Sequence, residues 1–131
     1  MKFAKSILIL SLSTLLLMSF SYQVEKWEFL GKRTVNFAID KDEIPVTLRE
    51  GTFSKIKLQV KKAPVHFRKV IVHYRNGSRE EIELRDNIPA GGETRVIDLR
   101  GNKRIITKVT FFYNTKPRAR KRAVVRLFGR N

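Results

Sequence analysis

The sequence predicts an all-β fold, a single antiparallel β-sandwich of about eight short strands. Apolar and polar side chains alternate with a period of two through most of the chain after residue 21. Turn-forming residues recur at intervals of about 8 to 12 positions, and no segment carries the apolar stripe of an amphipathic helix. We therefore expect two packed sheets in one domain, with no internal repeat or linker.

The expected strands are the segments in which the alternation is clear. Near the start, Lys26–Leu30 and Arg33–Ile39 lie on either side of Gly31. In the longest apolar segment, one face is expected to carry Ile105, Val109, Phe111 and Tyr113. The later strands are expected at Ile44–Leu48, Phe53–Lys61, Val70–Arg75, Arg79–Leu84, Val96–Leu99, Ile105–Tyr113 and Ala123–Phe128.

The connections between these strands carry turn-forming residues. Asn76-Gly77 is the strongest short hairpin signal, because a tight two-residue turn needs positive φ at both central positions. Ile88–Gly92 holds a proline and paired glycines, which do not fit a β ladder. Gly101-Asn102 turns the chain again, and Asn114–Arg122 is expected to be a charged loop.

The core is expected to come from one apolar face of each strand. No disulfide can support it, because the chain has no cysteine. Burial of one large apolar side chain stabilises a fold by roughly 1.5–3 kcal/mol. The predicted core residues are Phe53, Ile56, Leu58, Val60, Val70, Val72, Ile82, Leu84, Ile97, Leu99, Val109, Phe111 and Val125.

The first 21 residues have the pattern of a cleavable export signal. A short basic head precedes an uncharged apolar run, and Ser19 and Ser21 place small residues at the minus-three and minus-one positions of a cut before Tyr22. The apolar run is about 15 residues long, whereas a membrane-spanning helix needs roughly 20. We expect a signal peptide at 1–21, one domain at 22–131, and a periplasmic or secreted mature protein without a transmembrane segment.

The chain is strongly basic, with 28 Lys and Arg against 12 Asp and Glu and a net charge of +16. The expected signal peptide contains two of the basic residues and none of the acidic ones, so the mature charge is about +14. Without a cysteine the mature protein has no site for a lipoprotein anchor. Such a balance favours partners that carry negative charge.

Five short motifs stand out: Trp27-Glu-Phe-Leu-Gly31, Val72-His-Tyr-Arg-Asn-Gly77, Gly91-Gly-Glu-Thr-Arg95, Ile97-Asp-Leu-Arg-Gly101 and Arg104-Ile-Ile106. Together they resemble a family of small exported bacterial proteins classed only as a domain of unknown function. The resemblance covers most of residues 25–130 and implies a secreted or periplasmic β-sandwich without a known reaction. The layout is also similar to galactose-binding-type jelly-roll sandwiches, a likeness of fold that transfers no ligand.

The basic C-terminal third is the sharpest functional signal. Residues 99–131 contain eleven Lys or Arg and no Asp or Glu. A dense basic patch attracts polyanions in a salt-dependent manner, although a solvated loop that only aids solubility is the alternative. No aromatic residue lies within the loop to stack on bases, so we expect no sequence-specific nucleic-acid binding. The expected contact residues are Lys103, Arg104, Lys116, Arg118, Arg120, Lys121 and Arg122.

Two groups of side chains offer metal ligands, and neither makes a full set. Asp40, Asp42 and Glu43 supply the oxygen ligands that Ca²⁺ takes, but a lysine lies among them and no EF-hand pattern is present. His66 and His73 lack further ligands at suitable spacing. We expect surface imidazoles and an acidic turn whose nearest partner is the basic C-terminal region. We predict no metal site and no cofactor. The sequence does not decide whether the acidic turn binds a cation.

Residues that could carry catalysis have simpler structural roles. Asp98 and Arg104 flank a glycine turn and are expected to pair across it. Glu80, Glu81 and Glu83 are compatible with a glycosidase acid pair, but Glu81 and Glu83 share one face of an Arg-rich hairpin, so cross-strand pairing with Arg75 and its neighbours is simpler. The expected mature chain has two serines, neither in a nucleophile-elbow context. We predict that the protein is not an enzyme.

Three large aromatic residues allow two interpretations. Trp27, Phe29 and Tyr113 could form a platform that stacks on sugars, as aromatic rings do in carbohydrate-binding modules. In a small domain without disulfides, large aromatic side chains are more often part of the core.

The sequence therefore predicts an exported binding module that contacts anionic envelope components through its basic C-terminal loop. Anionic polysaccharide, lipopolysaccharide and lipid head groups are the expected partners. The alternative is a structural or stress-related accessory protein of the envelope that acts through protein contacts. The sequence does not define the oligomeric state, and it does not distinguish a periplasmic protein from a secreted one.

The expected export signal leads to one direct prediction. Mass spectrometry of the native protein should find a chain that begins at Tyr22, in a fraction outside the cytosol, because the small residues before it direct the cut. An intact Met1 in a cytosolic fraction would contradict the expected signal peptide.

Overall fold

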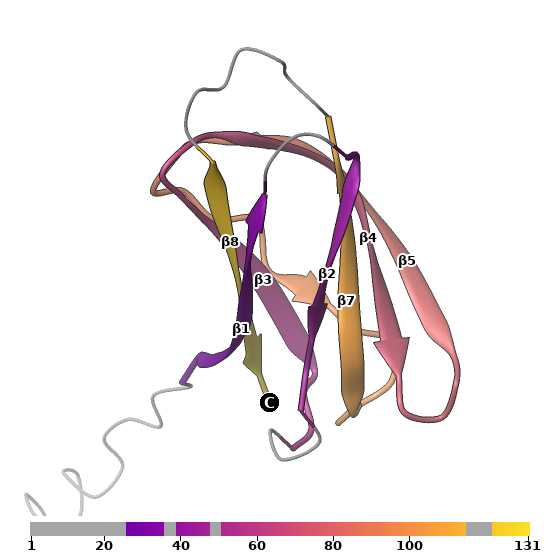
Figure 1. Cartoon of the computed structure of the whole chain (residues 1–131). Helices are drawn as coiled ribbons and strands as arrows, with labels where there is room; N and C mark the ends of the chain where they lie inside the picture. Colours follow the sequence, from indigo (N-terminus) through magenta and orange to yellow (C-terminus); the bar gives the residue numbers. More distant parts are fainter. Residues whose placement is uncertain (1–25, 36–38, 48–50, 115–121) are drawn as a thin grey trace, which may run out of the picture.

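The computed structural model describes residues 26–35, 39–47, 51–114 and 122–131. These residues form eight strands in two four-stranded antiparallel sheets, so the predicted all-β sandwich is confirmed (Figure 1). None of them belongs to a helix, and thus no helix in the described part could cross a membrane. The strands are β1 (Glu28–Val35), β2 (Lys41–Pro45), β3 (Lys55–Lys61), β4 (Val65–Tyr74), β5 (Arg79–Ile88), β6 (Ile97–Asp98), β7 (Ile106–Tyr113) and β8 (Ala123–Arg130).

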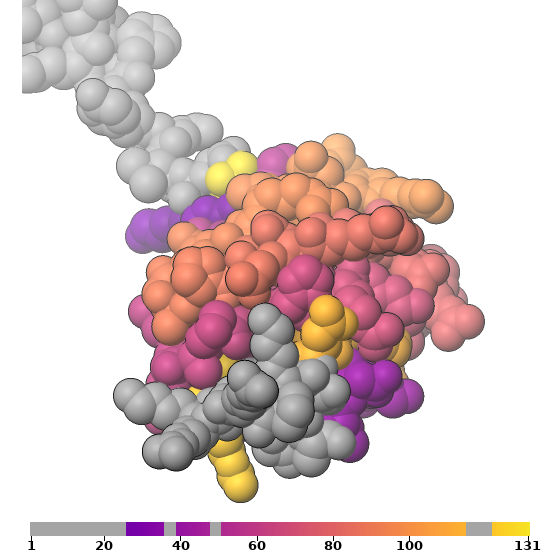
Figure 2. Space-filling model, turned by 90° about the horizontal axis from the view of Figure 1, so that it is seen from above, coloured from indigo at the N-terminus to yellow at the C-terminus, as the bar shows by residue number. Residues whose placement is uncertain are grey.

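The strand order is that of a jelly roll. Sheet A has the order β1-β8-β3-β6 and sheet B the order β2-β7-β4-β5. Four antiparallel pairs are nested along the chain: β1 with β8, β2 with β7, β3 with β6 and β4 with β5. The pairs β3–β8 and β4–β7 complete the two layers. As this order requires, early and late parts of the chain interleave at the end of the molecule seen in Figure 2.

The β4–β5 hairpin forms where Asn76-Gly77 predicts it, but with a different turn. Only Gly77 has positive φ, at 88°, and its amide donates to the Tyr74 carbonyl at 3.0 Å. The Tyr74 amide donates to the Ser78 carbonyl, which leaves a three-residue loop rather than a two-residue one. The Asn76 side chain accepts the Ser78 amide at 2.9 Å, and this local bond stabilises the longer turn.

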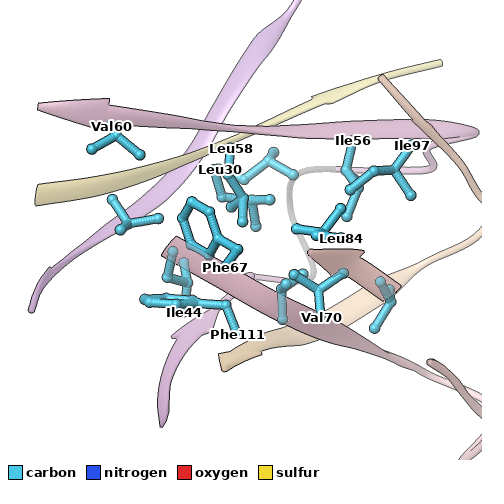
Figure 3. Packing of buried hydrophobic residues seen from close by; sticks show 14 of the residues in the cluster. Leu30, Ile44, Ile56, Leu58, Val60, Phe67, Val70, Leu84, Ile97 and Phe111 are labelled. Carbon is cyan, nitrogen blue, oxygen red and sulfur yellow. The ribbon is translucent and has the colours of Figure 1, made fainter. Parts of the chain in front are cut away.

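The core lies between the two sheets (Figure 3). All of the predicted core residues are buried except Ile82, which packs partly buried against the cluster. The largest fully buried side chains include Tyr113, Phe53, Phe67 and Phe111. Phe67 and Phe111 meet edge to face at 5.9 Å between ring centroids.

Strand boundaries differ from expectation: β2 begins at Lys41 rather than Ile44, β4 begins at Val65 rather than Val70, and two further differences lie at irregular places. Gly31 lies within β1, and the β1–β8 register shifts between Phe29 and Gly31. A Cβ atom on Gly31 would lie 2.7 Å from Ile44 Cγ2, so a larger residue would press against β2. At the start of β7 the register also shifts, and Ile106 rather than Ile105 is buried there.

Two buried tyrosines donate hydrogen bonds to buried carboxylates. Tyr113 Oη donates to Asp42 Oδ2 at 2.9 Å, and Tyr74 Oη donates to Glu80 Oε1 at 2.7 Å. Burial raises the pKa of both hydroxyls, and the hydrogen bond to a carboxylate raises it further. Each pair thus satisfies polar atoms that would otherwise be costly to bury.

Gly129 gives a test of the core packing. A Cβ atom there would lie 2.7 Å from Phe53 Cδ1 and 2.8 Å from Leu30 Cδ1. We expect Gly129→Ala to lower the free energy of unfolding by about 1–3 kcal/mol, because the Phe53 ring has no room to move. Urea denaturation measures this change. Phe53→Leu should relieve the clash, so a double variant as unstable as the sum of the single changes would contradict the proposed contact.

The tyrosine–carboxylate pairs predict a loss of stability in alkali. Above about pH 10 an unfolded tyrosine loses its proton, while Tyr74 and Tyr113 keep theirs in the folded state. The folded state then holds more protons, so the free energy of unfolding falls as pH rises, by up to about 1.4 kcal/mol per pH unit for each tyrosine. Chemical denaturation should show a flatter fall for the Y74F/Y113F variant, and an equal slope would contradict the assignment.

Candidate functional site

The outer face of sheet A consists of the residues that alternate with the buried ones on β1, β8 and β3. The strand register places Phe29 beside Phe128 and Lys32 beside Arg126, and it places Lys57 on the other side of Phe128. We call this surface the basic aromatic face. Its members are Trp27, Phe29, Lys32, Lys55, Lys57, Lys61, Arg126, Phe128 and Arg130.

Lys57 occupies the middle of the basic aromatic face. Its ammonium nitrogen lies 4.5 Å from the centroid of the Trp27 ring, 6.0 Å from that of Phe128 and 2.8 Å from Glu93 Oε2. Only 18% of its side chain is exposed. The guanidinium of Arg130 also lies over Trp27, at 4.9 Å. Two cations therefore hold one indole ring in place.

A second group of contacts surrounds Arg126. Its guanidinium carbon lies 4.9 Å from the centroid of Phe29 and 5.3 Å from that of Phe128. The two rings meet edge to face at 5.7 Å. Arg126 Nη1 also donates to Gln59 Oε1 at 3.2 Å. Although Phe29 is held in this way, 44% of its surface remains exposed to a ligand.

The charges of the basic aromatic face are only partly balanced. Lys55 pairs with Asp98 at 3.2 Å, at the edge of the face along β6. Among the residues described, no carboxylate forms an ion pair with Lys32, Lys61 or Arg126. The strands nearest the centre of the sheet thus carry excess positive charge.

The outer face of sheet B is more evenly balanced. Lys69 pairs with Glu81 at 2.6 Å, and Lys108 pairs with Glu43 at 3.3 Å. The hydrogen bond from Lys69 lowers the pKa of the Glu81 carboxyl. The two sheets of one molecule therefore present different electrostatic surfaces.

The predicted basic contact residues do not form one patch in the described structure. Arg122 directly precedes β8, whereas Lys103 and Arg104 precede β7 at the opposite end of the sandwich (Figure 1). The eight residues of β7 separate these ends by roughly 25 Å. The remaining predicted residues, Lys116, Arg118, Arg120 and Lys121, lie outside the described residues.

The expected ion pair between Asp98 and Arg104 is absent. Asp98 pairs instead with Lys55 across the β3–β6 register. The Arg104 guanidinium stacks on the Tyr74 ring at 3.7 Å and donates to the Arg100 carbonyl at 2.7 Å. The aromatic ring and the carbonyl form a better-defined site for a planar guanidinium than an exposed carboxylate does.

The acidic segment meets the basic C-terminal third only through the pair of Glu43 with Lys108 among the residues described, and its other two partners lie earlier in the chain. Each of its carboxylates lies 3.3 Å from a different basic side chain, and these come from β1, β4 and β7. The pairs are Asp40–Arg68, Asp42–Arg33 and Glu43–Lys108. In the described ranges no three His, Asp or Glu residues are grouped as metal ligands.

His73 belongs to a row that crosses three strands of sheet B. Its Nε2 atom lies 3.3 Å from Thr110 Oγ1, which donates to Glu43 Oε1 at 3.5 Å. Burial lowers the pKa of His73, and the positive charge of Lys108 lowers it further. The hydroxyl stands between imidazole and carboxylate, whereas a hydrolytic triad needs the imidazole in the middle.

The three aromatic residues considered for a sugar platform are split between the two interpretations. Trp27 and Phe29 lie on the basic aromatic face, but Tyr113 is fully buried in the core. Phe128 joins the first two instead. Alternation from the predicted core residue Val125 would have placed Phe128 on the outer face of its strand. Only the β1–β8 pairing shows that Phe128 meets Phe29.

Comparison with known proteins confirms the fold and the family resemblance. No curated protein sequence matches the chain. The solved structure of AlgX from Pseudomonas aeruginosa is similar, with a TM-score of 0.51 and 17% sequence identity over 81% of this chain and 26% of AlgX. The chain thus spans about a quarter of AlgX, and at this identity the likeness shows the fold alone. The model of the domain of unknown function DUF2541 matches residues 7–129, and the chain therefore belongs to the DUF2541 family.

Proposed function

We propose that this protein is an exported module that binds an anionic polysaccharide of the cell envelope across its basic aromatic face. The observation that carries the proposal is the interleaving of cations and aromatic rings on β1, β8 and β3. Each class of side chain suits a different part of such a ligand.

The cations suit the acidic groups of the polymer. Lys32, Lys61 and Arg126 have no ion-pair partner among the described residues, so their charge is directed at solvent. Because the whole chain carries a charge of +16, the long-range potential also favours an anionic polymer. Arg122 at the start of β8 extends this charge toward the basic loop.

The aromatic rings suit the apolar faces of sugar rings. Phe29 and Phe128 are paired across β1 and β8, and Trp27 directly precedes β1, where Lys57 lies over its ring. Their contacts with Lys57 and Arg126 fix the rings before a ligand arrives, which reduces the entropy lost on binding. A purely solubilising surface has no need for exposed aromatic rings among its charges.

Binding to immobilised heparin and lipopolysaccharide tests this function. We expect the K61Q/R126Q variant to elute at lower salt than wild type, and the slope of log Kd against log salt to fall by about one to two. Phe29→Ala should weaken polysaccharide binding further without changing this slope. K41Q/R79Q is the matched control, because it removes two exposed charges from the outer face of sheet B.

Equal losses in both double variants would show that net charge alone causes retention and would contradict a specific face. If neither polyanion is retained, and cross-linking recovers one defined protein partner, the alternative of an envelope accessory protein replaces the proposal. A variant with Lys116, Arg118, Arg120 and Lys121 changed to Gln measures how much the basic loop contributes to retention on heparin and lipopolysaccharide.

A further inference from the structure

A second basic region lies at the opposite end of the sandwich from Arg122. The β4–β5 hairpin and the connection before β7 border an open hollow of about 430 Å³ there, and the Arg75 amide donates to the Ile105 carbonyl at 3.0 Å to join its two sides. The hollow is lined by Tyr74, Arg75, Asn76, Lys103, Arg104 and Ile105. We propose that Arg75, Lys103 and Arg104 bind a phosphate group in this hollow, as a site separate from the basic aromatic face.

Arg104 is held in place before any ligand binds. Its guanidinium stacks on the Tyr74 ring at 3.7 Å, and Nη1 and Nη2 donate to the Arg100 carbonyl at 2.7 Å and to Ser78 Oγ at 3.1 Å. A Cβ atom on Gly101 would lie 3.2 Å from Arg104 Cδ, so the glycine lets the chain pass close to this side chain. A fixed guanidinium loses little entropy when it binds an oxyanion.

Lys103 lines the same hollow from a strained backbone. Its φ of 56° lies in the left-handed region, which a non-glycine residue adopts at a cost of roughly 1 kcal/mol or more. Gly101, two residues earlier, also has positive φ, and a glycine at position 103 would avoid the cost. Lys103 therefore adds a third positive charge to those of Arg75 and Arg104 in the lining of the hollow.

No carboxylate lines the hollow to cancel these charges. In the described part of the chain, Arg75, Lys103 and Arg104 take part in no ion pair. The nearby Glu80 is buried and already has partners: its Oε1 atom accepts from Tyr74 Oη at 2.7 Å and from the Arg100 amide at 2.9 Å, and its Oε2 atom lies 3.8 Å from Arg100 Nε. The positive potential of the hollow is therefore available to attract an anionic ligand.

The number and type of the cations favour phosphate over a carboxylate. Three cations exceed the single charge of a carboxylate but match a phosphate monoester, which carries about −1.5 to −2 at neutral pH. The planar fork of Arg75 can bind two phosphate oxygens, Arg104 keeps donor hydrogens beyond the two bonds that it already makes, and the Lys103 ammonium provides a compact point charge. The phosphate could be the free ion or part of a phosphorylated sugar.

Titration of the full mature protein with inorganic phosphate and with glucose 1-phosphate, followed by amide NMR, tests the site. We expect shifts at residues 74–76 and 103–105, and roughly tenfold weaker binding for Lys103→Gly and for Arg75→Gln. Lys62→Gly is the matched control, because Lys62 also has positive φ, at 72°, and lies beyond the far end of β4. It removes the same charge and the same strain, and it should bind phosphate as tightly as wild type.

Tighter binding of glucose 1-phosphate than of inorganic phosphate would identify a phosphorylated sugar as the source, and equal binding would identify the phosphate group alone. The site is overturned if Lys103→Gly binds like wild type, if Lys62→Gly loses as much affinity, or if acetate binds as tightly as phosphate. The K61Q/R126Q variant should retain phosphate binding, so failure of the basic aromatic face would leave this result unaffected. Thermal unfolding should show neither glycine variant less stable than wild type.

Discussion

The structure depends on a nested set of antiparallel pairs centred on the Asn76-Gly77 hairpin. Outward from this turn, β4 pairs with β5, β3 with β6, β2 with β7 and β1 with β8. The outermost pair joins Glu28 to Gly129, about a hundred residues apart, and no disulfide holds it, because the chain has no cysteine. Closing so long a loop costs little more than closing a shorter one, since the entropy grows only with the logarithm of length. Packing of the inner faces must therefore supply the free energy that keeps the first and last strands together.

The same pairing creates the basic aromatic face. Phe29 and Phe128 are distant in sequence, and they meet only because β1 lies antiparallel beside β8. On β8 the buried Leu127 alternates with the outward Phe128 and Arg126. A slip of one residue in this register would bring Arg126 to the core and expose Leu127. Core burial thus fixes which side chains the face presents, so the fold and the proposed binding surface are specified by one alternation.

Local patterns predicted most of the fold, because strand alternation and hairpin turns depend on neighbouring residues. The predicted core residues are buried except Ile82, which packs only partly buried on the edge strand β5, but the prediction missed fully buried side chains such as Phe67 and Leu127. The pairing of Asp98 with Lys55 could not be predicted, because it depends on which strand lies beside β6. The position of Arg104 over Tyr74 could not be predicted either, for it needs the hairpin and the loop before β7 to meet. The sequence grouped basic residues by proximity along the chain, whereas among those described the fold places Lys103 and Arg104 at one end of the sandwich and Arg122 at the other.

The central position of Lys57 makes a rigid basic aromatic face compatible with the polysaccharide binding that we propose. Its ammonium group is shared between the Glu93 carboxylate and the Trp27 ring, and little of its side chain is exposed. A lysine held in this way contributes less to ligand attraction than to the placement of the rings around it. The more exposed Lys61 and the guanidinium of Arg126 are better placed to meet acidic groups, since no carboxylate pairs with them in the described residues. The proposed face then combines fixed aromatic rings with the unpaired cations Lys61 and Arg126, and ordered rings lower the entropy lost when a flexible polymer binds.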